Sequence, residues 1–164
     1  MDYRAAQVHT CTADRTAEVL ADVLRERGVR SAEGRGARGA RPGLARGVRR
    51  EVREDAAEIP APQLDALDGV VTASAVGCAG SGTIFLDGFA DQGRRALSLV
   101  PDLHVCVVDL SSVEAGVPDA VVAARAAAAR APDQRAVDHV RHRAGTRRGV
   151  RSPRVLDVVI RADA

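Results

Sequence analysis

The sequence predicts an α/β fold built on a mainly parallel sheet, and three features of its 164 residues support this. Two nearly continuous apolar runs, LHVCVV at residues 103–108 and VLDVVI at residues 155–160, are typical of strands buried on both faces of a parallel sheet. An Ala-rich stretch at residues 119–130 is typical of a helix. Strands and helices that follow one another in this way indicate a sheet covered by helices.

The N-terminal third is predicted to hold one helix, at residues 12–28. Thr12 is a suitable N-cap, the apolar residues recur at helical spacing, and Gly28 is a suitable end. Residues 31–50 are rich in glycine and lack periodic apolar positions, so we expect neither a helix nor a strand there. Regular structure resumes with a short helix at residues 63–67.

Two strands and a glycine-rich turn are predicted for the middle of the chain. Residues 69–75 are small and β-branched, residues 83–86 form a second apolar stretch, and the turn GCAGSG occupies residues 77–82 between them. A helical turn is expected at residues 92–99. Pro118 stands where the first turn of the Ala-rich helix tolerates a proline.

Length and composition limit the class of protein. The size suits one α/β domain, 46% apolar residues suffice for a core, and no apolar run is long enough to span a membrane. The N-terminus lacks the layout of a signal peptide, so we expect a cytoplasmic protein. Cys11, Cys78 and Cys106 stand too far apart in sequence for an iron–sulfur or zinc site built by this chain alone, and we expect no cofactor. All 24 basic residues are Arg, which excludes mechanisms that need a Schiff-base or phosphate-loop lysine.

Charge is strongly segregated, although the net charge is only +2. Residues 25–53 hold ten Arg and three acidic residues, a net charge of +7. Residues 125–154 hold nine Arg and two acidic residues, again a net charge of +7. Between them, residues 54–124 hold two Arg and eleven acidic residues, a net charge of −9. Two basic arms suggest a nucleic-acid-associated protein, because Arg neutralises phosphates and releases counterions. With only three aromatic residues, however, stacking platforms are scarce, and solvated Arg-rich stretches explain the same pattern.

Five motifs of the chain carry a family resemblance. They are LDALDGVV, GTIFLD, QGRRALSLVPDLHVCVV, VPDAV and, near the end, SPRVLDVVI. Together they resemble the LUD domain family, of the lactate utilization protein C type. The resemblance is continuous over residues 64–122 and returns at residues 149–160, and the block G-R-R-x-L-x-L-x-P-D-x-H at residues 93–104 is specific.

The resemblance implies a three-layer α/β/α sandwich like that of the NagB/RpiA/CoA-transferase group, with residues 1–164 forming one LUD-like domain. It also implies a role in the oxidation of L-lactate to pyruvate, alongside two partner proteins that carry the iron–sulfur clusters. The scattered cysteines fit this division, because this subunit would not bind the clusters itself. Whether the chain is an enzyme, a ligand-binding subunit or an assembly subunit stays open.

Three departures from the family pattern affect the expected chemistry. The family reads A-E-T-G-T where residues 79–83 read AGSGT, so an acidic residue is missing. The family's G-V-H-G-P appears as GVRSP at residues 149–153, so a histidine is missing too. The family segment S-G-P-S-x-x-x-D-I-E is absent between residues 132 and 149. An inactive remnant of the family is therefore a further alternative.

Paired frameshifts, in the gene or in its sequencing, explain the Arg-rich windows at about residues 31–48 and 133–148. GC-rich codons read out of frame yield Arg, Ala, Gly and Pro. Residues 133–146 can be encoded so that a frame shifted by one base reads TSGPSTTSDIELE, which restores the missing segment. The same shift from Gly34 onward permits VVVPAGLDPAWL, a strand-and-turn pattern typical of the family's N-terminal half. On this hypothesis the basic arms are accidents without function.

The turn formed by Gly80, Ser81, Gly82 and Thr83 is the first candidate ligand site. Its small residues let backbone N–H groups and hydroxyls approach a phosphate or a carboxylate closely. A tight turn that requires glycine for its backbone angles explains the same residues. The fold class implied by the resemblance favours a ligand, because it places ligands at loops beyond the sheet edge.

Three further residues complete the candidate site. Arg94 and Arg95 are the only basic residues of the acidic middle segment. They suit a bidentate contact with a carboxylate such as that of lactate, or a salt bridge to a neighbouring acid. His104 opens a buried strand, where a histidine is either a ligand group or a hydrogen-bonded core residue.

Two cysteines and two histidines are not included in the candidate site. We expect Cys106 to be an inert buried thiol, whereas the glycine turn around Cys78 is a setting that lowers a thiol pKa. His139 and His142 would share one face of a helix, but a third metal ligand is missing from the pattern.

Overall fold

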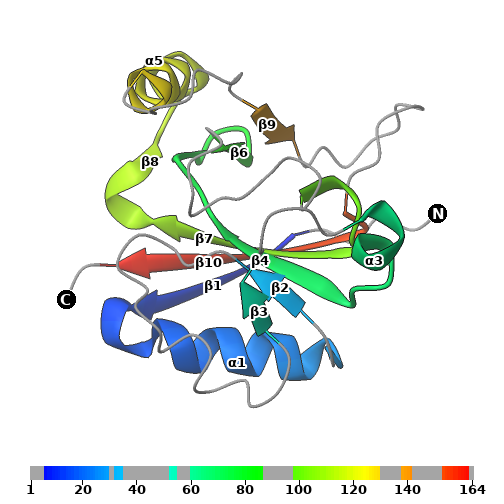
Figure 1. Cartoon of the computed structure of the whole chain (residues 1–164). Helices are drawn as coiled ribbons and strands as arrows, with labels where there is room; N and C mark the ends of the chain where they lie inside the picture. Colours follow the sequence, from blue (N-terminus) through cyan, green and yellow to red (C-terminus); the bar gives the residue numbers. More distant parts are fainter. Residues whose placement is uncertain are drawn as a thin grey trace.

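The computed structural model of the chain confirms the predicted α/β fold. It describes residues 6–29, 32–34, 52–54, 60–86, 98–129, 138–141 and 153–162. The main sheet has six strands: β1 (Gln7–Thr12), β2 (Ala32–Gly34), β3 (Val52–Glu54), β4 (Gly69–Ala73), β7 (Leu103–Asp109) and β10 (Val155–Ala162). They lie in the order β1-β10-β7-β4-β2-β3, and every neighbouring pair is parallel (Figure 1).

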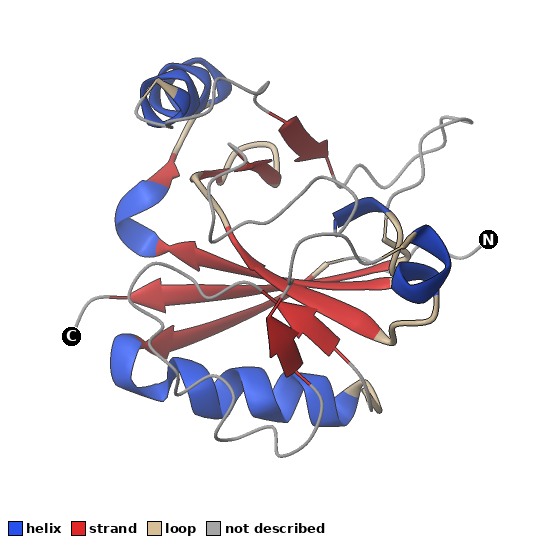
Figure 2. Cartoon of the chain, viewed as in Figure 1, coloured by secondary structure: helices blue, strands red, loops and turns tan. Residues whose placement is uncertain are grey.

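A second, smaller sheet has four strands in the order β8-β5-β6-β9. They are β5 (Val76–Cys78), β6 (Thr83–Leu86), β8 (Val113–Glu114) and β9 (Asp138–Arg141). The helical elements are η1 (Ala13–Arg15), α1 (Thr16–Glu26), α3 (Ala61–Asp65), η2 (Leu110–Ser112) and α5 (Val117–Ala128). Figure 2 shows α1 along one face of the main sheet, with the small sheet and α5 on the opposite side.

The apolar strands of the main sheet form the core, as the sequence predicts. Every residue of β4 is buried, and so is β7 up to its last residue. On one side of the sheet, Val105, Val107 and Val159 pack against Leu20 and Leu24 of α1. On the other side, the same strands pack against β6. Both faces are therefore dry, which explains why these strands read as continuous apolar runs.

The predicted helix at residues 12–28 is confirmed at its centre and end but not at its start. Thr12 is the last residue of β1, one 3₁₀ turn follows, and α1 begins at Thr16, whose hydroxyl donates to the Thr12 carbonyl over 3.2 Å. Gly28 has the left-handed φ of +69° expected of a residue that ends a helix, and its N–H donates to the Arg25 carbonyl. The strand before the helix was not predicted.

Long-range pairing also changes two expectations in the first half of the chain. Residues 32–34, for which no strand was expected, form β2 between β3 and β4. The strand predicted at residues 69–75 ends at Ala73, and the chain enters β5 at Val76. Gly77 is therefore a strand residue, and it needs to be small because a Cβ there would lie 3.2 Å from Cγ1 of Val108.

The second half follows the prediction more closely. Helix α5 starts two residues before the predicted range with Pro118 in its first turn, and β10 extends two residues beyond Ile160. His139 lies in the strand β9, antiparallel to β6, so it is not on a helix, and His142 lies outside the described residues. In the described part of the chain, no helix is long and apolar enough to cross a membrane.

Candidate functional site

The carboxyl ends of the parallel strands form the edge at which open α/β sheets bind their ligands. All six strands are parallel, but the order in which the chain adds them to the sheet changes direction between β2 and β4. From β2 the chain continues outward to β3, whereas from β4 it continues the opposite way, to β7. Ligands of such sheets bind beside this reversal, beyond the strand ends. The candidate site therefore lies at the carboxyl edge, next to Gly34 and Ala73.

Three polar side chains occupy this edge. Ser74 follows β4 and donates its hydroxyl to the Val107 carbonyl over 3.2 Å. Arg161 on β10 donates from Nε to Oδ1 of Asp109, the last residue of β7, over 2.6 Å. The Arg161 side chain is only 13% exposed, whereas Asp109 is 43% exposed. This ion pair links the ends of β7 and β10. Because the carboxylate balances its charge, Arg161 is not a free cation for a ligand.

The glycine turn joins β5 to β6 and is fixed to the segment that precedes α5. The Ala79 N–H donates to the Glu114 carbonyl over 2.9 Å, and the Gly80 N–H donates to the Ala115 carbonyl over 3.0 Å. A Cβ at Gly80 would lie 2.7 Å from that Ala115 oxygen, so the close approach requires glycine. Gly82 has a φ of +63°, which again favours glycine.

The groups that this turn offers to a ligand follow from these contacts. Ser81 and Gly82 are exposed, whereas Thr83 is buried and accepts a hydrogen bond from the Ser81 hydroxyl over 2.9 Å. The Gly80 N–H is used inside the protein. The turn geometry alone accounts for both glycines, and binding of an anion by Gly80, Ser81, Gly82 and Thr83 stays a prediction.

His104 lies near the opposite end of the sheet from this turn. It is the second residue of β7, it is 1% exposed, and its Nε2 lies 2.7 Å from the Thr72 hydroxyl oxygen on β4. This is the hydrogen-bonded core histidine that the sequence offered as one alternative. The turn adjoins β8, which follows the carboxyl end of β7, so the structure does not bring His104 together with the turn.

Two other candidate residues lie outside the described part of the chain. Arg94 and Arg95 belong to the stretch between β6 and Ser98, and nothing in the structure locates their side chains. Their contact with a carboxylate stays a prediction.

Two of the three cysteines, Cys78 and Cys106, are buried, and Cys11 is half-buried. Burial raises the pKa of the Cys106 thiol to about 12, a shift that its contact with Thr72 only partly offsets. This thiol stays protonated at neutral pH, as expected for an inert core cysteine. Cys78 is buried in β5 rather than exposed in the turn, and Cys11 lies 3.7 Å from the Thr16 hydroxyl oxygen. Among the described residues, no three His, Cys, Asp or Glu side chains are grouped to hold a metal ion.

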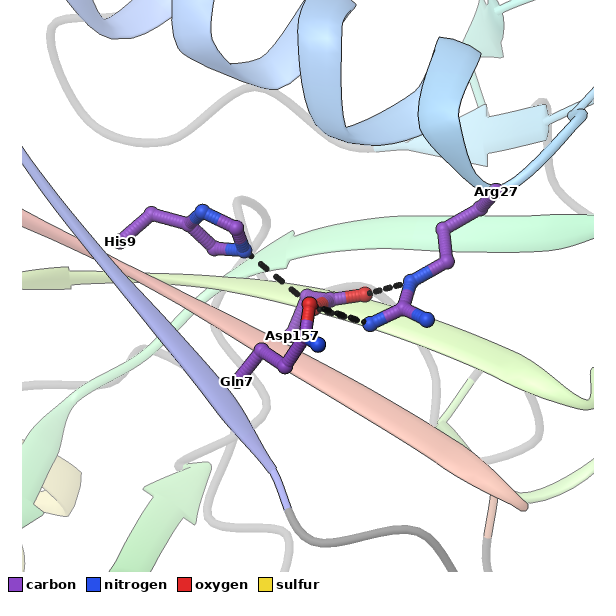
Figure 3. A network of polar contacts seen from close by, with 4 residues as sticks. All are labelled: Gln7, His9, Arg27 and Asp157. Atoms are coloured by element: carbon purple, nitrogen blue, oxygen red, sulfur yellow. Dashed lines mark hydrogen bonds and ion pairs between the residues drawn. The ribbon is translucent and has the colours of Figure 1, made fainter.

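A buried charge network that the sequence analysis missed lies at the amino end of the sheet (Figure 3). Asp157 on β10 is completely buried, and Arg27 at the end of α1 donates to both of its oxygens, from Nε over 2.8 Å and from Nη2 over 2.9 Å. Nη2 also donates to Oε1 of Gln7, over 2.8 Å. Nε2 of His9 lies 3.3 Å from Oδ1 of Asp157.

The network has the geometry of a structural ion pair. A bidentate guanidinium–carboxylate pair satisfies a buried charge, and a cation at the end of a helix interacts favourably with the helix dipole. The hydrogen bond to Asp157 raises the pKa of Arg27, so this guanidinium stays charged at any physiological pH. The sequence held one signal, a lone Asp inside the apolar run VLDVVI, but no pattern pointed to its partner.

Comparison with known proteins adds to this geometry. Residues 2–138 match the model of the family described as LUD domain. Lactate utilization protein C of Deinococcus radiodurans is 40% identical over 108 residues, which are 66% of this chain and 48% of that protein. The chain thus spans about half the length of this curated relative.

A solved structure shares the fold. It is the crystal structure of a duf162 family protein from Deinococcus radiodurans, with a TM-score of 0.76 and 30% sequence identity. The match covers 95% of this chain and 88% of the other. The arrangement of the main and small sheets is therefore one that a natural protein adopts.

Replacing Asp157 tests the buried pair. We expect Asp157→Asn to lower the free energy of unfolding by about 3–5 kcal/mol, because a largely buried guanidinium loses its counter-charge. Urea denaturation measures the change. Asp102→Asn is the matched control, since Asp102 pairs with Arg154 where both side chains are more than 60% exposed, and we expect almost no effect. Equal effects of the two substitutions would contradict the assigned role.

Replacing Gly82 tests the backbone of the turn. No atom lies within 4 Å of a Cβ built at Gly82, so only the left-handed φ opposes a side chain. We expect Gly82→Ala to cost about 1 kcal/mol of stability and Gly82→Asn clearly less, because Asn tolerates this conformation. Thermal unfolding of both variants gives the comparison. A milder effect of Ala than of Asn would show that the turn has another conformation.

Proposed function

The chain belongs to the LUD domain family, and from this premise we propose that it is a component of an L-lactate utilization system in the cytoplasm. The observation that carries the proposal is its sequence identity to a protein named for lactate utilization. The reaction we assign to the system is the two-electron oxidation of L-lactate to pyruvate. The two electrons pass to partner proteins that carry iron–sulfur clusters.

The cysteines of the chain support placing the clusters in partners. Clusters are held by several thiolates, whereas this chain has three cysteines, one each on β1, β5 and β7. Two of them are buried, and the raised pKa of Cys106 keeps that thiol protonated. Within the system, we assign the chain the role of a ligand-binding or assembly subunit, and whether it is also catalytic stays open.

The ligand that fits such a role is a small carboxylate or phosphate. We place it at the glycine turn, where Ser81 and Gly82 are exposed and Thr83 lies directly behind them. Arg94 and Arg95 would supply the bidentate cationic contact that a carboxylate prefers. Gly80 completes this proposed ligand-binding set. His104 does not belong to it, because it lies near the opposite end of the sheet, with its Nε2 2.7 Å from the Thr72 hydroxyl oxygen.

We also propose that the windows 31–48 and 133–148 are products of paired frameshifts within a single LUD-like domain. The family match runs through the first window and ends at residue 138, just inside the second, so it supports a frameshift in the second window only. The nucleic-acid alternative depends on the same windows, so it falls if they are out of frame. The DNA sequence decides: we expect codons that encode TSGPSTTSDIELE in the shifted frame. Codons incompatible with that string would refute the frameshift.

A growth assay tests the lactate role. The host is a Deinococcus radiodurans strain without its lactate utilization protein C, grown with L-lactate as the carbon source. We expect the chain, or a version with both windows returned to the family frame, to restore growth, and Arg94→Ala/Arg95→Ala to abolish the rescue. Growth on glucose, with circular dichroism of the purified variants, controls for viability and folding.

The outcomes separate the hypotheses. Rescue by the frame-restored version alone would retain the family role and make the present chain an inactive remnant. Rescue by neither version, when both are folded and expressed, would contradict the lactate role.

A further inference from the structure

Strand β1 is an edge of the main sheet. It pairs with β10 in unbroken register over all six of its residues, and in the described part of the chain no strand pairs with its other side. An edge strand exposes a row of N–H and C=O groups, which form a template for another strand. The residues of an edge strand therefore indicate whether it is protected from pairing or is available to pair with another strand.

The other edge strands carry the features that protect monomers. Charged residues, short length, bulges and proline prevent edge-to-edge pairing. β3 has three residues, of which Arg53 and Glu54 are charged, and β8 has two, of which Glu114 is charged. β9 carries Asp138 and Arg141. β1 is the longest of the four, and its sequence QVHTCT contains no Asp, Glu, Arg or Pro.

The surface beside β1 is apolar. Val8 is 60% exposed, although valine is usually buried. Because side chains alternate along a strand, Val8 lies on the face opposite α1, next to its register partner Val158. Val158 is itself only half-buried, and so is Ile160, the register partner of Thr10. An apolar strip thus follows the unpaired edge.

We propose that β1 pairs with β1 of a second copy of this chain, antiparallel and across a two-fold axis, to form one continuous sheet. Charge supports this occupant. An uncharged strand has nothing to attract a phosphate backbone or a charged segment, whereas two copies of β1 meet without opposing like charges. His9, the one imidazole of the strand, faces Asp157 of its own chain and stays out of the contact.

The two-fold arrangement would pair the exposed backbone groups of β1 and cover Val8. Each copy supplies hydrogen-bond partners to the exposed backbone of the other. Val8 of each copy is covered by the partner strand, on the same face in both, because a two-fold axis perpendicular to the sheet preserves its faces. The inference is independent of the lactate role, since β1 contributes no residue to the proposed ligand site.

Light scattering coupled to size exclusion, over roughly a hundredfold range of concentration, tests the dimer. We expect the full chain to be dimeric, and Val8→Glu to raise the dissociation constant at least about tenfold, since two carboxylates then face a shared edge. Val122→Glu is the matched control, because Val122 on α5 is 68% exposed and lies away from β1, and it should remain dimeric. Thr10→Arg, on the same strip, should act like Val8→Glu.

Hydrogen exchange supplies a second readout. The amides of Gln7–Thr12 should gain protection as concentration rises, and Val8→Glu should remove that gain. At concentrations low enough for both proteins to be monomeric, Val8→Glu should leave the melting temperature unchanged. A chain that is monomeric at every concentration overturns the proposal. Equal effects of Val8→Glu and Val122→Glu overturn it too, as does open-ended aggregation in place of a dimer.

Discussion

The placement of the last strand between the first strand and β7 is the constraint on which the rest of the structure depends. β10 pairs with β1 along one side and with β7 along the other, so it joins the two ends of the chain in one sheet. It also brings a carboxylate, Asp157, into a fully buried position. That charge is tolerated only because Arg27 reaches it from the end of α1. The ion pair therefore links the end of α1 to β10, in addition to the apolar contacts of Leu20 and Leu24 with the strands that α1 covers.

This arrangement separates the polar residues of the chain into two groups with different tasks. The amino end of the sheet holds the Asp157 network, in which Arg27 pairs with the buried carboxylate. The small sheet and the glycine turn adjoin β8, beyond the carboxyl end of β7, where Asp109 is paired with Arg161. Ligands of parallel sheets bind at carboxyl ends, so the ligand site that we propose and the buried ion pair lie at opposite ends of the sheet.

The residues of the candidate site were predicted with uneven success. The glycine turn was found in the right place because a close backbone approach and a positive φ demand glycine, and such demands are visible in a sequence. The turn begins later than expected, however, because Gly77 is small for packing against Val108 and not for a turn. His104 was assigned correctly to a buried strand, but its partner Thr72 could not be deduced, since the two are 32 residues apart and meet only when β4 pairs with β7.

By itself, the sequence determined the fold class, the two central strands and the helix α5, because local composition and apolar periodicity mark buried strands and helices directly. It also carried the motifs of the family. Only the tertiary structure decided which strands are neighbours. β1 and β2 have weak local patterns, and their hydrogen bonds come from distant segments: β1 pairs with β10, and β2 with β3 and β4. The partner of Asp157 is 130 residues away in sequence, and no local pattern encodes a contact of that range.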